Sequence, residues 1–189
     1  MSSALAVYLP QALMLGWLLR QMTGRPSAWF WALPLAAVPL AGLPLAGHLR
    51  GLFGDPSVTT LQLLLLTLFW RTPSSFTAGR TPLHIGLGGL IFYTLALGAA
   101  PMLGITDPYR FGYQPAWLVG ALSLPALYLW WRGRPLWLAL LAIDLFVFAA
   151  DWHSSRNFWD LLIDPQLIVV CLVLAWRKRR RLNAPSSHQ

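Results

Sequence analysis

Charged residues are scarce in this sequence, and glutamate is missing altogether. Of the 189 residues, 57% are hydrophobic and only 11% are charged. Soluble domains contain about 25% charged residues, so this chain lacks the polar surface that keeps a protein in water. The scarcity of charge excludes an ordinary soluble domain, and the long apolar stretches indicate an integral membrane protein.

Cysteine is nearly absent as well. Cys171 is the single cysteine and lies inside an apolar run, so an internal disulfide and the paired cysteines of a structural zinc site are excluded. The sequence also lacks the H-E-x-x-H and G-x-S-x-G signatures. Gly86-Leu-Gly88-Gly89 is not a phosphate loop, because no Gly-Lys-Ser/Thr follows it; it predicts close helix packing instead. We expect no cofactor and predict no metal site.

No basic residue precedes the first apolar segment, which begins at Ala4. This pattern predicts a retained span and not a cleaved signal peptide. Arginine is strongly preferred over lysine, and alanine, leucine, proline, glycine and tryptophan are abundant, as is typical of GC-rich bacterial genomes. We therefore expect the protein in a bacterial cytoplasmic (inner) membrane.

Seven apolar segments predict the fold. Several are shorter than the roughly 20 residues of a perpendicular span, so we expect local bilayer thinning or small shifts of the boundaries. We predict an all-α bundle of about seven transmembrane helices, forming a single domain over residues 1–182 before a disordered cytoplasmic tail at 183–189. Six spans with a re-entrant last segment is the alternative. The segments are Ala4–Leu19, Ala28–Ala46, Pro56–Trp70, Leu83–Leu103, Ala116–Trp131, Pro135–Ala150 and one within Asn157–Trp176.

The distribution of basic residues orients these spans. If the basic tail is cytoplasmic and there are seven spans, the N-terminus lies outside. Eleven of the fourteen basic residues then fall on the cytoplasmic side, as the positive-inside rule requires, against Arg50, Arg110 and Arg156 outside. The inner ones are Arg20, Arg25, Arg71, Arg80, Arg132, Arg134 and the run Arg177, Lys178, Arg179, Arg180 and Arg181.

The basic run at 177–181 directly follows an apolar segment, where it is typical of a stop-transfer signal. No aromatic-interleaved basic face or nucleic-acid-binding motif accompanies it, so we do not expect nucleic acid as a partner. We expect the run to bind anionic lipid headgroups.

The second segment contains three prolines five residues apart, Pro34, Pro39 and Pro44. Each removes a backbone donor and bends a helix. We interpret this segment as a kinked packing helix, with an unwound element lining a cavity as the alternative.

Three aspartates, Asp55, Asp107 and Asp164, each precede a proline. Aspartate is a preferred N-cap and proline is favoured at the first helical position. We therefore predict that these three residues cap helices.

Asp144 is different because it lies in the middle of the sixth segment. A carboxylate at that depth is costly unless it is paired or neutralised, so it should face the bundle interior. Asp151, seven residues later, would share its helical face. Asp144 is either a structural residue, ion-paired or protonated, or a proton-carrying or substrate-binding group. Its candidate partners are Arg156, Arg50, Arg110, His48 and His153.

Asp160 and Asp164 would share a face if one helix carried both, whereas capping by Asp164 would separate them. If the pair survives, these residues form an outward-facing acidic cluster with Asp151 and His153, and a divalent cation held by these carboxylates and the histidine is the less favoured alternative to a cluster without metal. The catalytic candidates are Asp144, Asp151, His153 and Asp160, and the substrate-binding candidates are Arg156, His48 and Arg50.

Three functions fit these patterns. The first is an accessory, scaffold or immunity-type subunit that acts through contacts with another membrane protein, as the small size and short loops indicate. The alternatives are an enzyme acting on a lipid or lipid-linked substrate at the outer face, through the Asp/His residues, and a transporter or proton/cation pathway centred on Asp144. The sequence identifies no reaction.

Overall fold

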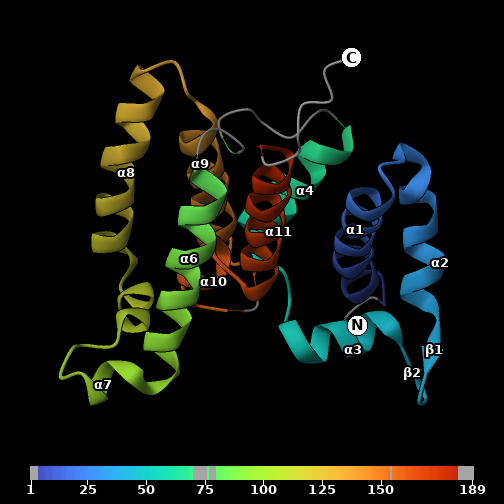
Figure 1. Cartoon of the computed structure of the whole chain (residues 1–189). Helices are drawn as coiled ribbons and strands as arrows, with labels where there is room; N and C mark the ends of the chain where they lie inside the picture. The colour runs from blue at the N-terminus through green and yellow to red at the C-terminus, as the bar shows by residue number, and fades with distance from the viewer. Residues whose placement is uncertain (1–3, 70–75, 77–79, 154, 183–189) are drawn as a thin grey trace.

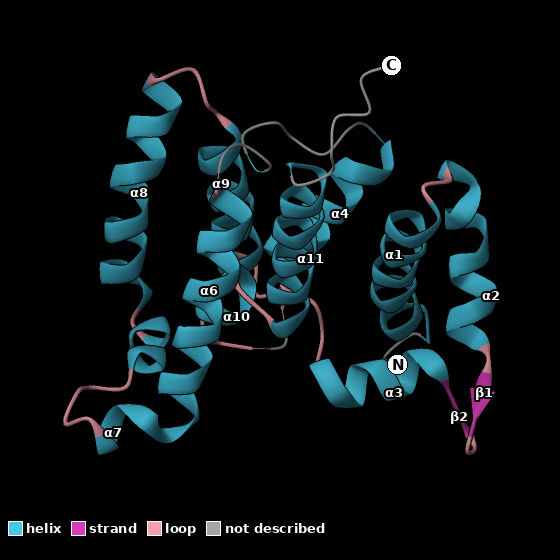
Figure 2. Cartoon of the chain, in the orientation of Figure 1, coloured by secondary structure: helices cyan, strands magenta, loops and turns pink. Residues whose placement is uncertain are grey.

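The computed structural model describes residues 4–69, 76, 80–153 and 155–182, and these are predominantly helical (Figure 2). The two strands β1 (Pro39–Leu40) and β2 (Leu43–Pro44) form a hairpin of two residues per strand, the only sheet in these ranges. The prediction of an all-α fold is therefore confirmed.

The helices follow the predicted apolar segments closely, except for the second and the last. In chain order they are α1 (Ala4–Thr23), the 3-10 helix η1 (Pro26–Trp31), α2 (Ala32–Ala37), α3 (Leu45–Phe53), α4 (Val58–Phe69), α6 (Thr81–Thr94), the π-helical turn η2 (Leu95–Ala99), α7 (Ala100–Met102), the 3-10 helix η3 (Pro108–Tyr113), α8 (Pro115–Trp131), α9 (Leu136–Ala149), α10 (Trp159–Leu162) and α11 (Pro165–Leu182).

Successive helices run in opposite directions along one axis (Figure 1). In the view of the figure, α1 runs up, α2 down, α4 up, α6 down, α8 up, α9 down and α11 up. The helix α3 is the exception, since it lies across the lower ends of its neighbours. The connections from α1 to α2 and from α8 to α9, together with the end of α11, lie at the upper end.

Two helical stretches, Thr81–Met102 and Trp159–Arg179, are long and apolar enough to cross a membrane. Large apolar side chains also lie on the outside of the molecule. On α8, for example, Trp117 is 81% exposed and Leu124 is 71% exposed. Exposed apolar surface of this kind is unfavourable in water and marks contact with a membrane or a partner. The fold is therefore suited to association with a membrane.

The second predicted segment, 28–46, is not a single helix. η1 and α2 contain six residues each, about 20 Å of helix in total, and the chain then turns back in the β1–β2 hairpin. Ala41 and Gly42 form the turn, with φ of 45° and 85°, as a two-residue type I′ hairpin requires. Pro39 and Pro44 lack the N–H groups that a helix would need there. The interpretation as one kinked helix is therefore wrong: the chain leaves the helical conformation after α2, and no residue of this segment lines the two pockets described below.

Close packing of α6 against α11 depends on two glycines. A Cβ atom on Gly86 would lie 2.9 Å from Cδ2 of Leu172, and one on Gly89 would lie 2.7 Å from Cγ1 of Ile168. Both distances are shorter than a van der Waals contact, so a larger residue at either position would force its α11 neighbour to shift. The expected packing role of the 86–89 segment is confirmed.

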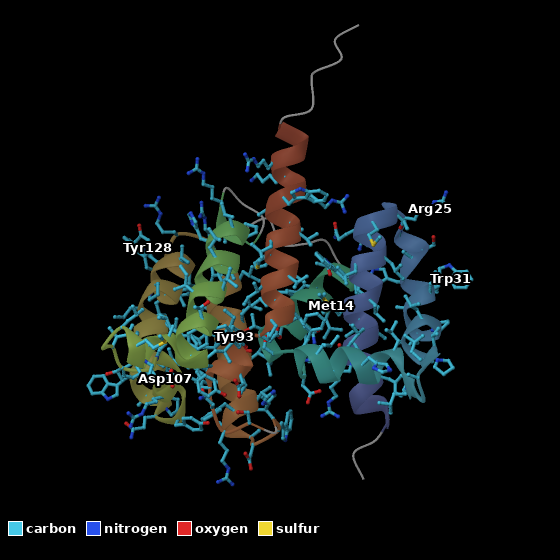
Figure 3. All side chains as sticks on the ribbon, turned by 60° about the horizontal axis from the view of Figure 1, so that its bottom comes forward. Met14, Arg25, Trp31, Tyr93, Asp107 and Tyr128 are labelled. Carbon is cyan, nitrogen blue, oxygen red and sulfur yellow. The ribbon has the colours of Figure 1, made fainter. Side chains whose placement is uncertain are left out.

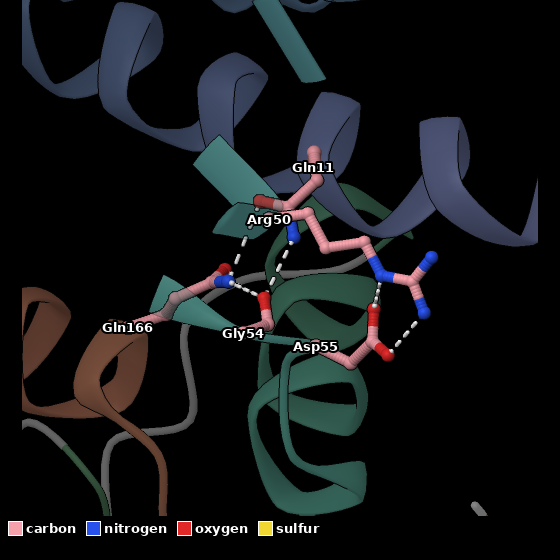
Figure 4. A network of polar contacts seen from close by, with 5 residues as sticks. All are labelled: Gln11, Arg50, Gly54, Asp55 and Gln166. Atoms are coloured by element: carbon pink, nitrogen blue, oxygen red, sulfur yellow. Dashed lines mark hydrogen bonds and ion pairs between the residues drawn. The ribbon is translucent and has the colours of Figure 1, made fainter. Parts of the chain in front are cut away.

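Polar side chains join α1 to the rest of the bundle (Figure 4). The Gln11 and Gln166 amides both donate to the backbone oxygen of Gly54, at 3.1 and 3.2 Å. Gln166 also donates to Oε1 of Gln11 at 3.4 Å. Both glutamines are buried, so these bonds fix the loop after α3 between α1 and α11.

Candidate functional site

Asp144 lies in the middle of α9 and is 1% exposed. Its carboxylate accepts two hydrogen bonds from side chains of α4. Thr59 Oγ1 donates to Oδ2 at 2.7 Å, and Gln62 Nε2 donates to Oδ1 at 2.7 Å. The predicted inward orientation of Asp144 is correct, but its partners are neutral, and none of the arginines or histidines proposed for it is bonded to it.

Asp144 does not share a helical face with Asp151. The helix α9 ends at Ala149, and Asp151 follows in a turn with φ of 53°. The helical spacing that would place the two carboxylates on one face therefore ends before Asp151. Asp144 belongs to the interior, whereas Asp151 is exposed on the loop.

An apolar pocket of about 320 Å³ borders Asp144; we refer to it as the Asp144 pocket. Its walls come from α4, α6, α8, α9, α10 and α11. Among the described lining residues, only Thr59 and Asp144 carry a hydroxyl or a carboxylate, and these two groups are bonded to each other. The other lining residues are Leu63, Phe76, Ile85, Leu122, Pro125, Ala126, Leu129, Trp137, Leu140, Leu141, Trp159, Leu162, Ile163 and Leu167.

A second, smaller pocket of about 240 Å³ lies at the loop between α9 and α10; we refer to it as the loop pocket. It is lined by Phe148, Asp151, His153, Ser155 and Arg156. Three of the residues selected from the sequence therefore share one pocket. Its polar lining contrasts with the apolar walls around Asp144.

Asp160 is joined to this loop through its hydrogen bonds. The Tyr109 hydroxyl lies 2.9 Å from both carboxylate oxygens, and Ser155 Oγ donates at 2.5 Å. Burial, followed by the bond to Asp160, raises the pKa of the Tyr109 phenol above its ordinary value. The phenol therefore stays protonated and acts as a donor.

The loop residues do not have the arrangement of a nucleophilic site. A catalytic serine would give its proton to a histidine ring, but the Ser155 hydroxyl is bonded to Asp160. His153 Nδ1 instead accepts from the backbone N–H of Ser155 at 3.1 Å. The part of the chain that the structure describes also contains no group of three His, Cys or Asp side chains placed to hold a metal ion.

The Asp-Pro prediction is correct at two of its three positions. Asp164 accepts from Leu167 N at 2.5 Å and so caps α11, and Asp107 accepts from Tyr109 N at 2.8 Å and caps η3. Capping by Asp164 separates it from Asp160, because Ile163 between α10 and α11 is extended. The outward-facing pair of these two aspartates is therefore not formed.

At Asp55 the capping prediction is wrong. Ser57 accepts from Thr60 N at 3.1 Å and so caps α4, while Asp55 forms an ion pair with Arg50 at 2.7 Å (Figure 4). The hydrogen bond to Asp55 raises the pKa of Arg50. A serine directly after the proline competes for the capping position, which explains the error.

His48 and Arg50 lie apart from both pockets. His48 Nε2 is bonded to the backbone oxygen of Leu40 at 2.8 Å, which attaches α3 to the hairpin. Arg50 is engaged by Asp55, and neither residue lines the Asp144 pocket or the loop pocket. These two substrate-binding candidates have local structural partners instead.

The start of the basic run is anchored. Arg177 donates through Nη1 to the backbone oxygen of Gln21 and, at 2.8 Å, to its side-chain oxygen. On the same side of the molecule, Arg20 Nη1 donates to the backbone oxygen of Thr67 at 2.8 Å. These contacts join α1 to α11 and to α4. The tail at 183–189 lies outside the described residues.

Several residues of these sites were not selected from the sequence. Thr59 and Gln62 stand three apart in an apolar helix, a spacing that places both on one face. Two polar residues within a predicted apolar segment were therefore the available signal. Tyr109 and Asn157 gave no comparable signal, because their contacts join segments about fifty residues apart.

Comparison with protein-family models, curated proteins and solved structures finds no match for this chain.

Proposed function

We propose that this chain is a seven-span membrane protein with its N-terminus outside and its C-terminus in the cytoplasm. The alternating directions of α1, α2, α4, α6, α8, α9 and α11 support this topology, although the second segment is too short to cross a full bilayer as a helix. Figure 3 places Arg25 at one end of the bundle and Asp107 near the other. The arginine-bearing ends agree with the positive-inside rule.

Within this protein, we propose that the Asp144 pocket binds an apolar molecule that carries a hydrogen-bond donor or a positive charge. The observation that carries the proposal is a buried carboxylate, fixed by Thr59 and Gln62, at the edge of a pocket whose other described lining residues, apart from Thr59, are apolar. Such pockets bind through apolar contact and use a few polar groups for orientation. A carboxylate inside a membrane bundle is costly to retain without a role.

Binding explains the geometry better than catalysis or transport. The carboxylates proposed for acid–base chemistry are in different environments, with Asp144 in the interior, Asp151 exposed on the loop and Asp160 bonded to Tyr109 and Ser155. A transport route needs polar groups leading away from Asp144 towards the cytoplasmic side. Among the described residues that line the Asp144 pocket, only Thr59 and Asp144 carry a hydroxyl or a carboxylate.

Binding of radiolabelled dodecylamine to the purified protein in nanodiscs tests this function. Ala126→Trp fills the pocket, because Ala126 is buried in its wall, and Leu124→Trp adds the same side chain to the exposed face of α8. We expect Ala126→Trp to abolish saturable binding and Leu124→Trp to preserve it. Asp144→Asn should weaken binding of the amine by about tenfold. Equal binding by both tryptophan variants would exclude the pocket as the site.

An accessory role through protein contacts is the second candidate. It is favoured by α8, which packs chiefly against α9 and η3 and presents Trp117, Leu124 and Trp131 outward. A tagged pull-down from native membranes in mild detergent tests it. A stoichiometric partner that Leu124→Trp releases and Ala126→Trp retains would support this role, and recovery of the chain alone would contradict it.

A further inference from the structure

The loop pocket contains one carboxylate and one guanidinium that are not paired with each other. Asp151 and Arg156 both line it, yet no ion pair or side-chain hydrogen bond engages either group within the described part of the chain. Opposite charges that face one small pocket without neutralising each other are complementary to a ligand that itself carries both charges.

The other walls of this pocket are fixed in position. The Phe148 ring packs edge-on against Phe158, with ring centroids 5.3 Å apart, and Phe158 is fully buried. The N–H of Ser155 donates to Nδ1 of His153, which leaves Nε2 as the ring nitrogen that can donate to a ligand. Ser155 itself is engaged by Asp160. The pocket thus offers two positions for an anion, His153 and Arg156, and one for a cation, Asp151.

The aromatic residues around the pocket place it at a membrane surface. Trp152 is 73% exposed and packs edge-on against Phe146, with centroids 5.4 Å apart. Exposed tryptophan at a helix end is typical of the headgroup region of a bilayer. The loop lies at the end of the bundle opposite the end of α11 (Figure 1), which in the proposed topology is the outer surface.

We propose that the loop pocket binds the phosphoethanolamine headgroup of a zwitterionic phospholipid. This headgroup carries a negative phosphate and a primary ammonium group that can donate N–H hydrogen bonds. Arg156 and His153 receive the phosphate, because guanidinium and imidazole N–H groups form short charge-assisted hydrogen bonds with phosphate oxygens. Asp151 receives the ammonium. The acyl chains stay in the bilayer beside Phe146 and Trp152. This site is separate from the Asp144 pocket and rests on the membrane topology proposed above.

This chemistry predicts an order of preference. A phosphocholine headgroup keeps the phosphate but has no N–H to donate to Asp151, and a phosphoglycerol headgroup places no cation there. Phosphatidylethanolamine should therefore be retained over both lipids with the same acyl chains, by about tenfold for the charged hydrogen bond that is lost.

Native mass spectrometry of the full chain with equimolar mixtures of these three lipids tests the proposal. Arg156→Gln should lower retention of all three by about tenfold, and Arg156→Lys should restore most of it. Asp151→Asn should abolish the preference for phosphatidylethanolamine while phosphate binding persists. The matched control is Arg110→Gln, an exposed arginine on η3 outside the pocket, which should behave as wild type.

Three results would overturn the proposal. Retention by Arg156→Gln equal to that by Arg110→Gln would exclude the pocket as a headgroup site. A preference for phosphatidylglycerol would indicate a site for anionic headgroups instead. Displacement of the lipid by an equal concentration of free glycerophosphoethanolamine would identify a soluble ligand and not a bilayer lipid.

Discussion

The bundle contains two buried carboxylates, Asp144 within α9 and Asp164 at the start of α11, and their surroundings differ. Asp164, 4% exposed, accepts hydrogen bonds from the backbone N–H groups of Leu167 and Ser57. Asp144, 1% exposed, accepts from the side chains of Thr59 and Gln62 and lines a pocket. The Asp164 carboxylate is bonded to the backbone at two helix starts, whereas the Asp144 carboxylate borders a pocket.

The kind of donor determines what each carboxylate can do. The backbone N–H groups at a helix start have no partner within the helix, so Asp164 supplies bonds that the fold requires. Thr and Gln side chains can rotate to other partners when a ligand arrives or when the carboxylate is removed. Asp164 therefore serves stability, and Asp144 is free to serve binding.

The largest effect should follow from removing the structural carboxylate. Asp164→Ala leaves the N–H groups of Leu167 and Ser57 without their acceptor and should destabilise the protein by about 3 kcal/mol. Thermal unfolding in detergent micelles measures the loss. Asp164→Asn keeps one acceptor oxygen and should lose about half as much. Equal stability of wild type and Asp164→Ala would contradict the structural role.

A smaller loss of stability should follow when the side chain of Asn157 is displaced. Like Asp164, Asn157 forms hydrogen bonds with backbone groups of other residues. It accepts from Trp159 N at 3.0 Å and donates to the Tyr109 backbone oxygen at 3.0 Å. A Cβ on Gly112 would lie 1.6 Å from its side-chain oxygen. Gly112→Ala should therefore cost about 2 kcal/mol. Gly120→Ala on α8, where nothing lies within 4 Å, is the control and should be neutral or slightly stabilising.

The local parts of this pattern could be predicted from the sequence. The motifs Asp107-Pro108 and Asp164-Pro165 indicated helix starts, because capping depends on residues within one turn. The glycines at 86 and 89 indicated a close helix contact for the same kind of local reason. Asp144 could be placed inside the bundle, because an apolar segment of helical length leaves a carboxylate no other favourable position.

The partners of these residues could not be predicted, because they come from distant segments. Asp144 and Thr59 are 85 residues apart, and Gln11 and Gln166 are 155 apart. Charge suggested an arginine or a histidine for Asp144, but inside an apolar bundle two neutral donors stabilise the carboxylate without burying a second charge. The hairpin at 39–44 was also missed, because its apolar residues resemble those of a span.

At the pocket carboxylate the effect on stability should be smaller than the effect on binding. Asp144→Asn leaves an amide oxygen for Thr59 or Gln62 and should change the unfolding free energy by about 1 kcal/mol. The same variant should lose about tenfold in affinity for dodecylamine. Thr59→Val, which removes only the supporting hydroxyl, should lose less. A loss of stability as large as that of Asp164→Ala would make Asp144 a second structural residue.

The smallest effect should follow at the exposed ion pair of Arg50 and Asp55, whose side chains are 45% and 36% exposed. Water solvates both groups in the folded and the unfolded state, so Arg50→Gln should cost about 0.5 kcal/mol at most, and less in high salt. Asp55 and Asp164 are both aspartates, so the difference between the losses of stability expected for Arg50→Gln and for Asp164→Ala comes from their environments. If Arg50→Gln destabilised the protein as much as Asp164→Ala, burial and backbone donors would not be what makes an aspartate structurally important in this fold.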